Sequence, residues 1–111
     1  MRLERSFRFA DEHLNNLLLR LVGRAGIAYG VDEHHTVYYR KRDEARFEDV
    51  LGEVRAEAFD SWQVLSSPED WIPKYRDEIA RRKIPCYEEV NNGRIEFLLP
   101  RAAKPHSWQM A

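Results

Sequence analysis

The sequence has a single cysteine, no long apolar run and almost no net charge. Cys86 has no partner for an internal disulfide, so a reduced, cytoplasmic setting is the simplest interpretation. No apolar stretch approaches the roughly 20 residues of a membrane-spanning helix, and residues 1–13 carry charges where a signal peptide needs its apolar region. The length of 111 residues fits one domain that folds without a disulfide or a metal.

Glycine is scarce and scattered, and the charges are balanced. The five glycines form neither the GxGxxG nor the GxxxxGK[ST] pattern that cradles phosphate groups. No serine has the G-x-S-x-G surroundings of a hydrolase nucleophile. The 18 lysines and arginines nearly equal the 19 acidic residues, which removes the strongest electrostatic argument for binding to nucleic acid or an anionic membrane.

The clearest structural signals lie in residues 67–100. Ser67 is expected to cap a helix. Because proline inside a helix removes a hydrogen bond, either the helix kinks at Pro73, or residues 67–71 form a short separate turn and the main helix begins at Pro73; we favour the second alternative. Pro85 ends that helix. Strands are expected over residues 84–90 and 94–99, joined by a tight turn at residues 91–93, where asparagine and glycine tolerate positive φ.

The earlier part of the chain carries a looser version of the same pattern. Alternation of apolar and polar residues predicts strands near residues 3–9, 27–31, 35–39 and 62–66. Leu14, Leu18 and Leu21 lie at helical spacing and predict a helix that follows Asp11 and ends at Gly26, a residue suited to the left-handed conformation. A second apolar stripe predicts a helix over residues 45–59.

The expected element order is βαββαβαββ, and its first six elements follow the βαββαβ order of ferredoxin-like folds. We therefore predict an α+β two-layer sandwich with a C-terminal αββ unit, which either extends the sheet or forms a second small layer. Residues 1–100 are expected to form a single domain, and residues 101–111 a tail that is either mobile or held back by Trp108. Residues 24–27 align with residues 81–84 in two βαββ units, so a duplication is a further hypothesis.

Candidate chemical groups are few, and each has a simple structural interpretation. His34 and His35 are weak metal candidates, because neighbouring strand residues point to opposite faces, and a solvated hairpin tip is the simpler interpretation. Cys86 needs a nearby base to act as a nucleophile, and it is expected to be a buried, inert thiol. Glu88 and Glu96 are expected on facing strands, as surface carboxylates. We predict no cofactor and no metal, and an enzyme is the least favoured hypothesis.

Aromatic residues are the most prominent surface candidates. The three tryptophans and five tyrosines are generous for a small domain. Trp62 and Trp71 are expected to anchor the core beneath the last helix, and either becomes an interface candidate if it is exposed, since Trp, Tyr and Arg dominate binding hot spots. The interface candidates predicted from the sequence are Trp71, Tyr75, Arg76, Trp62, Tyr38 and Arg40.

The leading hypothesis is a small, soluble, intracellular, non-enzymatic binding protein that acts through protein–protein contact or self-association. An immunity or inhibitor protein that neutralises a toxin is one concrete form of it. One alternative is a dimeric regulatory domain that binds a small molecule. Another is nucleic-acid binding through strand aromatics, with Phe7, Phe9, Tyr38 or Tyr39 stacking on bases. Phe7 and Phe9 share a face with Leu3, which favours a core position instead, and no membrane partner is expected.

Overall fold

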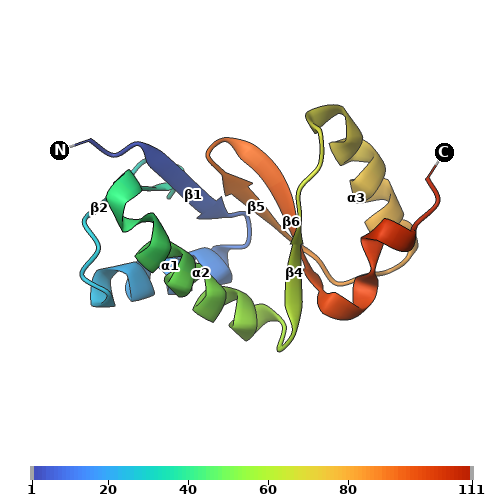
Figure 1. Cartoon of the computed structure of the whole chain (residues 1–111), viewed down its shortest axis with the longest axis horizontal. Helices are drawn as coiled ribbons and strands as arrows, with labels where there is room; N and C mark the ends of the chain where they lie inside the picture. The colour runs from blue at the N-terminus through green and yellow to red at the C-terminus, as the bar shows by residue number, and fades with distance from the viewer. Residues whose placement is uncertain (1, 111) are drawn as a thin grey trace.

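A computed structural model describes residues 2–110, and this part of the chain follows the expected βαββαβαββ order (Figure 1). The strands are β1 (Arg5–Phe9), β2 (Tyr29–Val31), β3 (Val37–Tyr39), β4 (Trp62–Leu65), β5 (Tyr87–Asn91) and β6 (Arg94–Pro100). The α-helices are α1 (Glu12–Arg24), α2 (Glu44–Ala58) and α3 (Ile72–Arg81). Short 3₁₀ turns lie at η1 (Lys41–Asp43), η2 (Glu69–Trp71), η3 (Arg101–Ala103) and η4 (Pro105–Ser107). The predicted α+β class is confirmed.

The six described strands form one antiparallel sheet in the order β2-β3-β1-β5-β6-β4. The β5–β6 hairpin lies between β1 and β4. Phe9 of β1 stands opposite Glu89 of β5, and Val64 of β4 stands opposite Leu98 of β6. The C-terminal αββ unit therefore extends the sheet by insertion, not at an outer edge.

The helices cover both faces of the sheet. On β6, Leu98 packs into a core with α1 and α2, whereas its neighbours Phe97 and Leu99 pack into a second core with α3. Because adjacent strand residues point to opposite faces, α3 lies on the face opposite to α1 and α2 (Figure 1). The structure thus differs from the predicted two-layer sandwich, since α3 adds a third layer over the β6–β4 end.

The first core lies between α1, α2 and the sheet. As predicted, Asp11 caps α1 by accepting a hydrogen bond from the Leu14 amide at 3.0 Å, and Gly26 follows the helix at φ 71°. Tyr39 stacks on Phe47 of α2 with ring centroids 3.8 Å apart. The buried members of this core are Phe7, Phe9, Leu14, Leu18, Val22, Ile27, Val37, Tyr39, Phe47, Val50, Leu51, Val54 and Leu98.

The second core is smaller and lies between α3 and the β6–β4 end of the sheet. Its buried members are Leu65, Ile72, Ile79, Phe97 and Leu99. As predicted, a separate turn, η2, precedes the helix that contains Pro73. The predicted cap is wrong, because the Ser67 hydroxyl donates to the Pro68 carbonyl at 3.3 Å and no side chain caps α3.

Two segments share one topology: β1-α1-β2-β3, here called the first unit, and β4-α3-β5-β6, the second unit. In each, the leading strand pairs with the last strand of the following hairpin. Gly26 and Lys83 both follow the helix in the left-handed region, at φ 71° and 56°. His35 and Asn92 occupy the two hairpin turns at φ 63° and 51°. The second unit is related to the first by a rotation of 180° about an axis that lies in the plane of the sheet and runs across its strands. Because such a rotation exchanges the two faces of the sheet, α3 lies on the face opposite to α1.

Candidate binding surface

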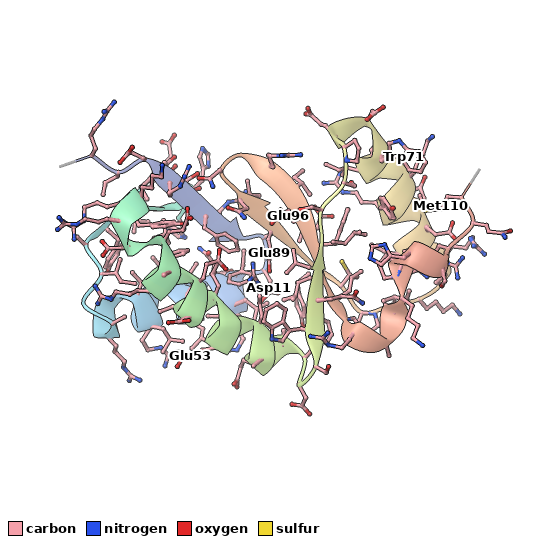
Figure 2. The ribbon with its side chains drawn as sticks, in the orientation of Figure 1. Asp11, Glu53, Trp71, Glu89, Glu96 and Met110 are labelled. Atoms are coloured by element: carbon pink, nitrogen blue, oxygen red, sulfur yellow. The ribbon has the colours of Figure 1, made fainter. Side chains whose placement is uncertain are left out.

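Trp71 stands at the start of α3 and points outward. The helical spacing of Ile72 and Ile79 turns both side chains into the second core, where each is buried. Trp71 precedes Ile72 and therefore falls outside this buried stripe, with 38% of its surface exposed. Figure 2 shows it on the outer part of the molecule, beside α3. The expectation that Trp71 anchors the core is wrong, and its alternative as an exposed interface candidate fits the structure.

An aromatic row leads from this exposed ring to the core. The ring of Tyr75 lies 6.3 Å from that of Trp71 and 6.4 Å from that of Trp108. On its inner side, Tyr75 lies 6.4 Å from Phe97 of β6. Tyr75 therefore fixes the two tryptophans relative to the sheet, which limits the freedom of the exposed rings.

Two cations lie over the tryptophan rings of this row. The Lys74 ammonium nitrogen is 4.5 Å from the centroid of Trp71, and the Arg82 guanidinium carbon is 4.9 Å from that of Trp108. Contacts of this kind are worth about 0.5–1 kcal/mol at exposed sites. We define the α3 aromatic surface as these five residues: Trp71, Lys74, Tyr75, Arg82 and Trp108.

The segment after β6 completes this surface. Trp108 donates its indole N–H to the Ala103 carbonyl at 3.1 Å, and it packs against the second core. Pro105 is buried in the η4 turn. Of the two alternatives for the tail, a mobile segment or one held back by Trp108, the structure shows the second.

Charges of both signs lie around the α3 aromatic surface. The acidic Glu69 and Asp70 directly precede Trp71, and Asp77 and Glu78 follow within α3. The basic residues of α3 and of the segments after α3 and β6 are Lys74, Arg76, Arg81, Arg82, Lys83, Arg101 and Lys104. Glu78 accepts hydrogen bonds from Arg81 and Arg82, and these lower the pKa of its carboxyl. A partner that also carries charges of both signs suits this surface.

The other predicted interface residues lie elsewhere or are engaged internally. Arg76 donates two hydrogen bonds to Glu88, at 2.9 and 2.8 Å, and so lies against β5. The expectation that Trp62 lies beneath the last helix is wrong: it packs on the first core, with the Arg55 guanidinium 5.2 Å from its ring centroid. Two further candidates hold loops in place, Tyr38 through its hydroxyl hydrogen bond to Asp32 and Arg40 through its ion pair with Asp43.

As predicted, Glu88 and Glu96 lie on the two paired strands of the last hairpin, β5 and β6. Across the hairpin, Glu88 stands opposite Phe97, and Glu89 stands opposite Glu96. Glu89 is fully buried and accepts hydrogen bonds from Nε and Nη2 of Arg55, at 2.9 and 2.7 Å. Burial raises the pKa of the Glu89 carboxyl, and Arg55 opposes that rise. Figure 2 places Glu89 and Glu96 near the centre of the molecule, where Glu89 serves as an internal ion-pair partner of α2.

The remaining reactive side chains do not form a reaction centre. His34 and His35 are exposed at the β2–β3 turn, and His34 lies 3.5 Å from Glu33. Within residues 2–110, no three histidine, cysteine or carboxylate side chains gather to hold a metal ion. Cys86 packs against the second core, and burial raises its pKa to about 12, which keeps the thiol protonated near neutral pH.

Each unit has a small cavity between its helix start and its hairpin turn. In the first unit the cavity measures about 100 Å³ and is lined by Glu12, Asn15 and His35 among others. Asn15 spans it by accepting from the Phe9 amide at 3.0 Å and donating to the His35 carbonyl at 2.9 Å. The cavity of the second unit measures about 130 Å³, and its lining residues are Ser67, Glu69, Ile72, Gly93, Arg94 and Ile95.

Strand aromatics offer little stacking surface. Phe7, Phe9 and Tyr39 are at most 2% exposed, which leaves Tyr38 from the group proposed for base stacking.

Of the residues of the α3 aromatic surface, the sequence predicted Trp71 and Tyr75 as interface candidates but not Lys74. A lysine three residues after a tryptophan on a helix lies beside it, so this spacing was a signal that could have identified Lys74.

No membrane-crossing element is present among the described residues: none of their helices has both the length and the apolar character that a bilayer span requires. Comparison with known proteins returned no match to a family model, to a curated protein or to a solved structure. The assignment of a function to this chain therefore depends on the geometry of its described residues.

Proposed function

We propose that this chain is a non-enzymatic binding protein that contacts another protein through the α3 aromatic surface. The single observation that supports this most strongly is the exposure of Trp71, held between Lys74 and Tyr75. Among the described residues, the large apolar side chains that stand exposed are Tyr29, Val31 and Trp71, and tryptophan is one of the residue types most enriched among binding hot spots.

The packing of the row also favours binding. Tyr75 lies against Phe97 and between the two tryptophans, so a partner would meet rings that are already ordered. Ordering a mobile side chain at an interface costs about 0.5–1.5 kcal/mol, and a pre-ordered one avoids most of that cost. The fitting partner carries an apolar contact flanked by charges of both signs, and an immunity or inhibitor protein bound to one target is the concrete form of the proposal.

The two alternative functions have weaker support. The burial of Phe7, Phe9 and Tyr39 speaks against a base-stacking platform on the sheet. The cavities of about 100 and 130 Å³ offer little space for a small molecule, since ligand pockets usually measure about 300–1,000 Å³. Two larger hollows, of about 460 Å³ beside Arg24 and about 360 Å³ beside Arg2, are open to solvent and lined largely by charged side chains, whereas ligand pockets are mostly enclosed and apolar. Protein binding is the function that the geometry supports best.

The test compares what three immobilised forms of the protein retain from extracts of its own source. One is the wild type, one is the Trp71→Ala, Lys74→Ala variant, and the third is a matched control, His13→Ala, Lys41→Ala, which also removes an exposed ring and a lysine but lies away from α3 and from β2. The proposal is supported if one protein is retained by the wild type and by the control but is not retained by the α3 variant. The circular dichroism spectra and melting temperatures of all three should agree closely, which separates lost binding from lost folding.

The opposite outcome is equally clear. If the α3 variant retains the same proteins as the wild type, or if the wild type retains none that the variant lacks, the α3 aromatic surface is not the binding site.

The finer organisation of the chain is part of the same proposal. We propose that the two units derive from a duplicated βαββ segment, supported by their shared strand pairing and by the matching left-handed residues Gly26 and Lys83. In this view the ferredoxin-like βαββαβ order arises from one unit plus α2 and β4. We further propose residues 1–100 as the single domain, with residues 101–111 as its tail, and a cytoplasmic setting in which Cys86 stays reduced.

A further inference from the structure

Strand β2 forms one edge of the sheet, and its side chains lack the usual protection of an edge. Tyr29 and Val31 are 43% and 44% exposed, and together with Gly30 they carry no charge. Edge strands are normally guarded by lysine, proline, a bulge or a covering loop. Of the features that protect edge strands from pairing with another chain, β2 has its short length of three residues.

The ladder of the neighbouring strands fixes which backbone groups of β2 are free. The Asp32 amide donates to the Thr36 carbonyl at 3.2 Å, so this pair is a hydrogen-bonded one. Antiparallel ladders alternate between bonded and non-bonded pairs, and Gly30 therefore bonds to Tyr38 of β3. The N–H and C=O groups of Tyr29 and Val31 consequently point outward, away from the sheet.

The hydrogen bonds of β1 lead independently to the same alternation of bonded and non-bonded pairs. Asn92 donates its amide to the Ser6 carbonyl at 2.9 Å and accepts from the Ser6 amide through its side chain at 2.8 Å. Ser6 thus bonds toward β5, and its neighbours in β1 bond toward β3. Val37 and Tyr39 then bond to β1, which leaves Tyr38 for β2.

We propose that a second copy of this chain pairs with β2 in an antiparallel, twofold-symmetric dimer centred on Gly30. In that register Tyr29 of each copy stands opposite Val31 of the other, in a hydrogen-bonded pair that uses the outward backbone groups. Aromatic and β-branched residues are favourable cross-strand partners. The two Gly30 residues meet in the closely spaced, non-bonded position, where their lack of side chains suits a tight approach.

Charge complementarity is the reason to choose a second copy as the occupant. Arg24 and Arg46 flank the start of the β2 segment, in a hollow that Asp49 and Glu53 also line, and Arg46 donates to the Ala25 carbonyl. Glu33 follows its end, with its side chain 86% exposed. Antiparallel pairing about Gly30 brings Glu33 of one copy toward the arginines of the other, twice by symmetry. Parallel pairing would instead place Glu33 beside Glu33 of the other copy.

The dimer is tested by sedimentation velocity over a wide range of protein concentration. The wild type should show a concentration-dependent monomer–dimer equilibrium. Val31→Lys should shift it toward monomer by at least tenfold in the dissociation constant, because it places a lysine on each edge. Gln109→Lys, which adds the same charge to an exposed residue outside the edge, should leave the constant unchanged.

A charge exchange tests the register. Glu33→Arg should weaken the dimer, and the further change Arg24→Glu should restore it at low salt. A wild type that remains monomeric throughout, a dimer that tolerates Val31→Lys, or a charge exchange without recovery would each overturn the proposal. Trp71→Ala should not affect the dimer, so this result and the test of the α3 aromatic surface can fail independently.

Discussion

The two units share one topology but differ in how completely their helix is covered. The first core has 13 buried side chains and the second has five. In the first unit, α2 lies beside α1, and Phe47 of α2 stacks on Tyr39. In the second unit the corresponding position holds the two 3₁₀ turns of the tail, with Trp108 as the main apolar contact.

This difference assigns most of the stability of the fold to the first unit and the candidate binding surface to the second. Both helices bury the residues that face the sheet: Leu14 and Val22 of α1 are 3% and 0% exposed, and Ile72 and Ile79 of α3 are 7% and 6% exposed. Within residues 2–110 no second α-helix lies beside α3, and Trp71, just outside its buried stripe, is 38% exposed. Regions with few buried apolar contacts open at lower free energy than the rest of a fold. We expect the second unit to be the less stable one and to carry the binding surface.

The largest effect is expected at the junction of the units. Arg55 of α2 pairs with Glu89 of β5, and the two side chains are 7% and 0% exposed. Arg55→Met leaves a buried carboxylate without its partner, which costs about 3–5 kcal/mol. Urea denaturation followed by tryptophan fluorescence measures this loss in the free energy of unfolding.

The double variant Arg55→Met, Glu89→Leu is the control for this change. Replacing a whole buried ion pair by apolar residues is often neutral or stabilising, so most of the lost stability should return. If the double variant is as unstable as the single one, the contacts of the Arg55 guanidinium with the rings of Phe7 and Trp62, and not the ion pair, join the units.

A smaller and more local effect is expected inside the second core. Ile79→Ala removes buried methylene groups at a site that is 6% exposed and should cost about 2–3 kcal/mol. Hydrogen exchange should then accelerate in α3 and in residues 101–108 before it does in α1. Val22→Ala, at the equivalent place in α1, should instead accelerate exchange throughout the protein. Uniform acceleration in both variants would show that the two cores unfold as one.

Trp108 provides a still smaller test of how the tail closes the second core. Trp108→Ala removes the contact with Arg82 and the hydrogen bond to Ala103, at a cost of about 1–2 kcal/mol. The thiol of Cys86 reports the change, since burial raises its pKa to about 12. Labelling at pH 8 should be slow in the native wild type and clearly faster in the variant. Equal rates would mean that the tail does not shield Cys86.

Sequence reasoning located most elements because their signals are local. The Asp11 cap, the Gly26 helix end and the turn at Asn92 follow from side-chain and φ preferences. The insertion of β5–β6 between β1 and β4 depends on long-range pairing, which no local pattern encodes. The exchange of faces follows from it and placed Glu89, not Glu88, under α2.

The candidate surface could be predicted in part. Trp71 and Tyr75 fall on one helical stripe with Ile79, and this spacing indicated burial for all three. The outcome was decided by Ile72, which took the buried position beside Trp71. Proline at the second position of α3 and the preceding turn η2 set the rotation of the helix. The apolar spacing alone does not tell which of Trp71 and Ile72 faces the sheet, because both fit a helical stripe. The choice depends on how the helix packs in the folded protein.

The smallest expected effect exchanges residues between the units. Gly26 and Lys83 hold the same left-handed position after their helices, at φ 71° and 56°. In the second unit the Ile84 amide closes the helix end on the Ile79 carbonyl at 3.1 Å, which is the usual setting for glycine. Lys83→Gly relieves the strain of a side chain at positive φ and should raise the free energy of unfolding by about 0.5–1 kcal/mol.

The reciprocal change Gly26→Ala should lower the free energy of unfolding by about 1 kcal/mol. A Cβ at Gly26 meets only the end of the Arg46 side chain, at 3.8 Å, so the cost would come from conformation and not from a clash. Thermal denaturation of both variants measures the pair of shifts. Because the second unit is held by the smaller core, a stabilised α3 end should also slow hydrogen exchange in α3 more than in α1. Shifts of the same sign in both variants would show that the two helix ends are not equivalent, and the parallel between the units would then be limited to strand pairing.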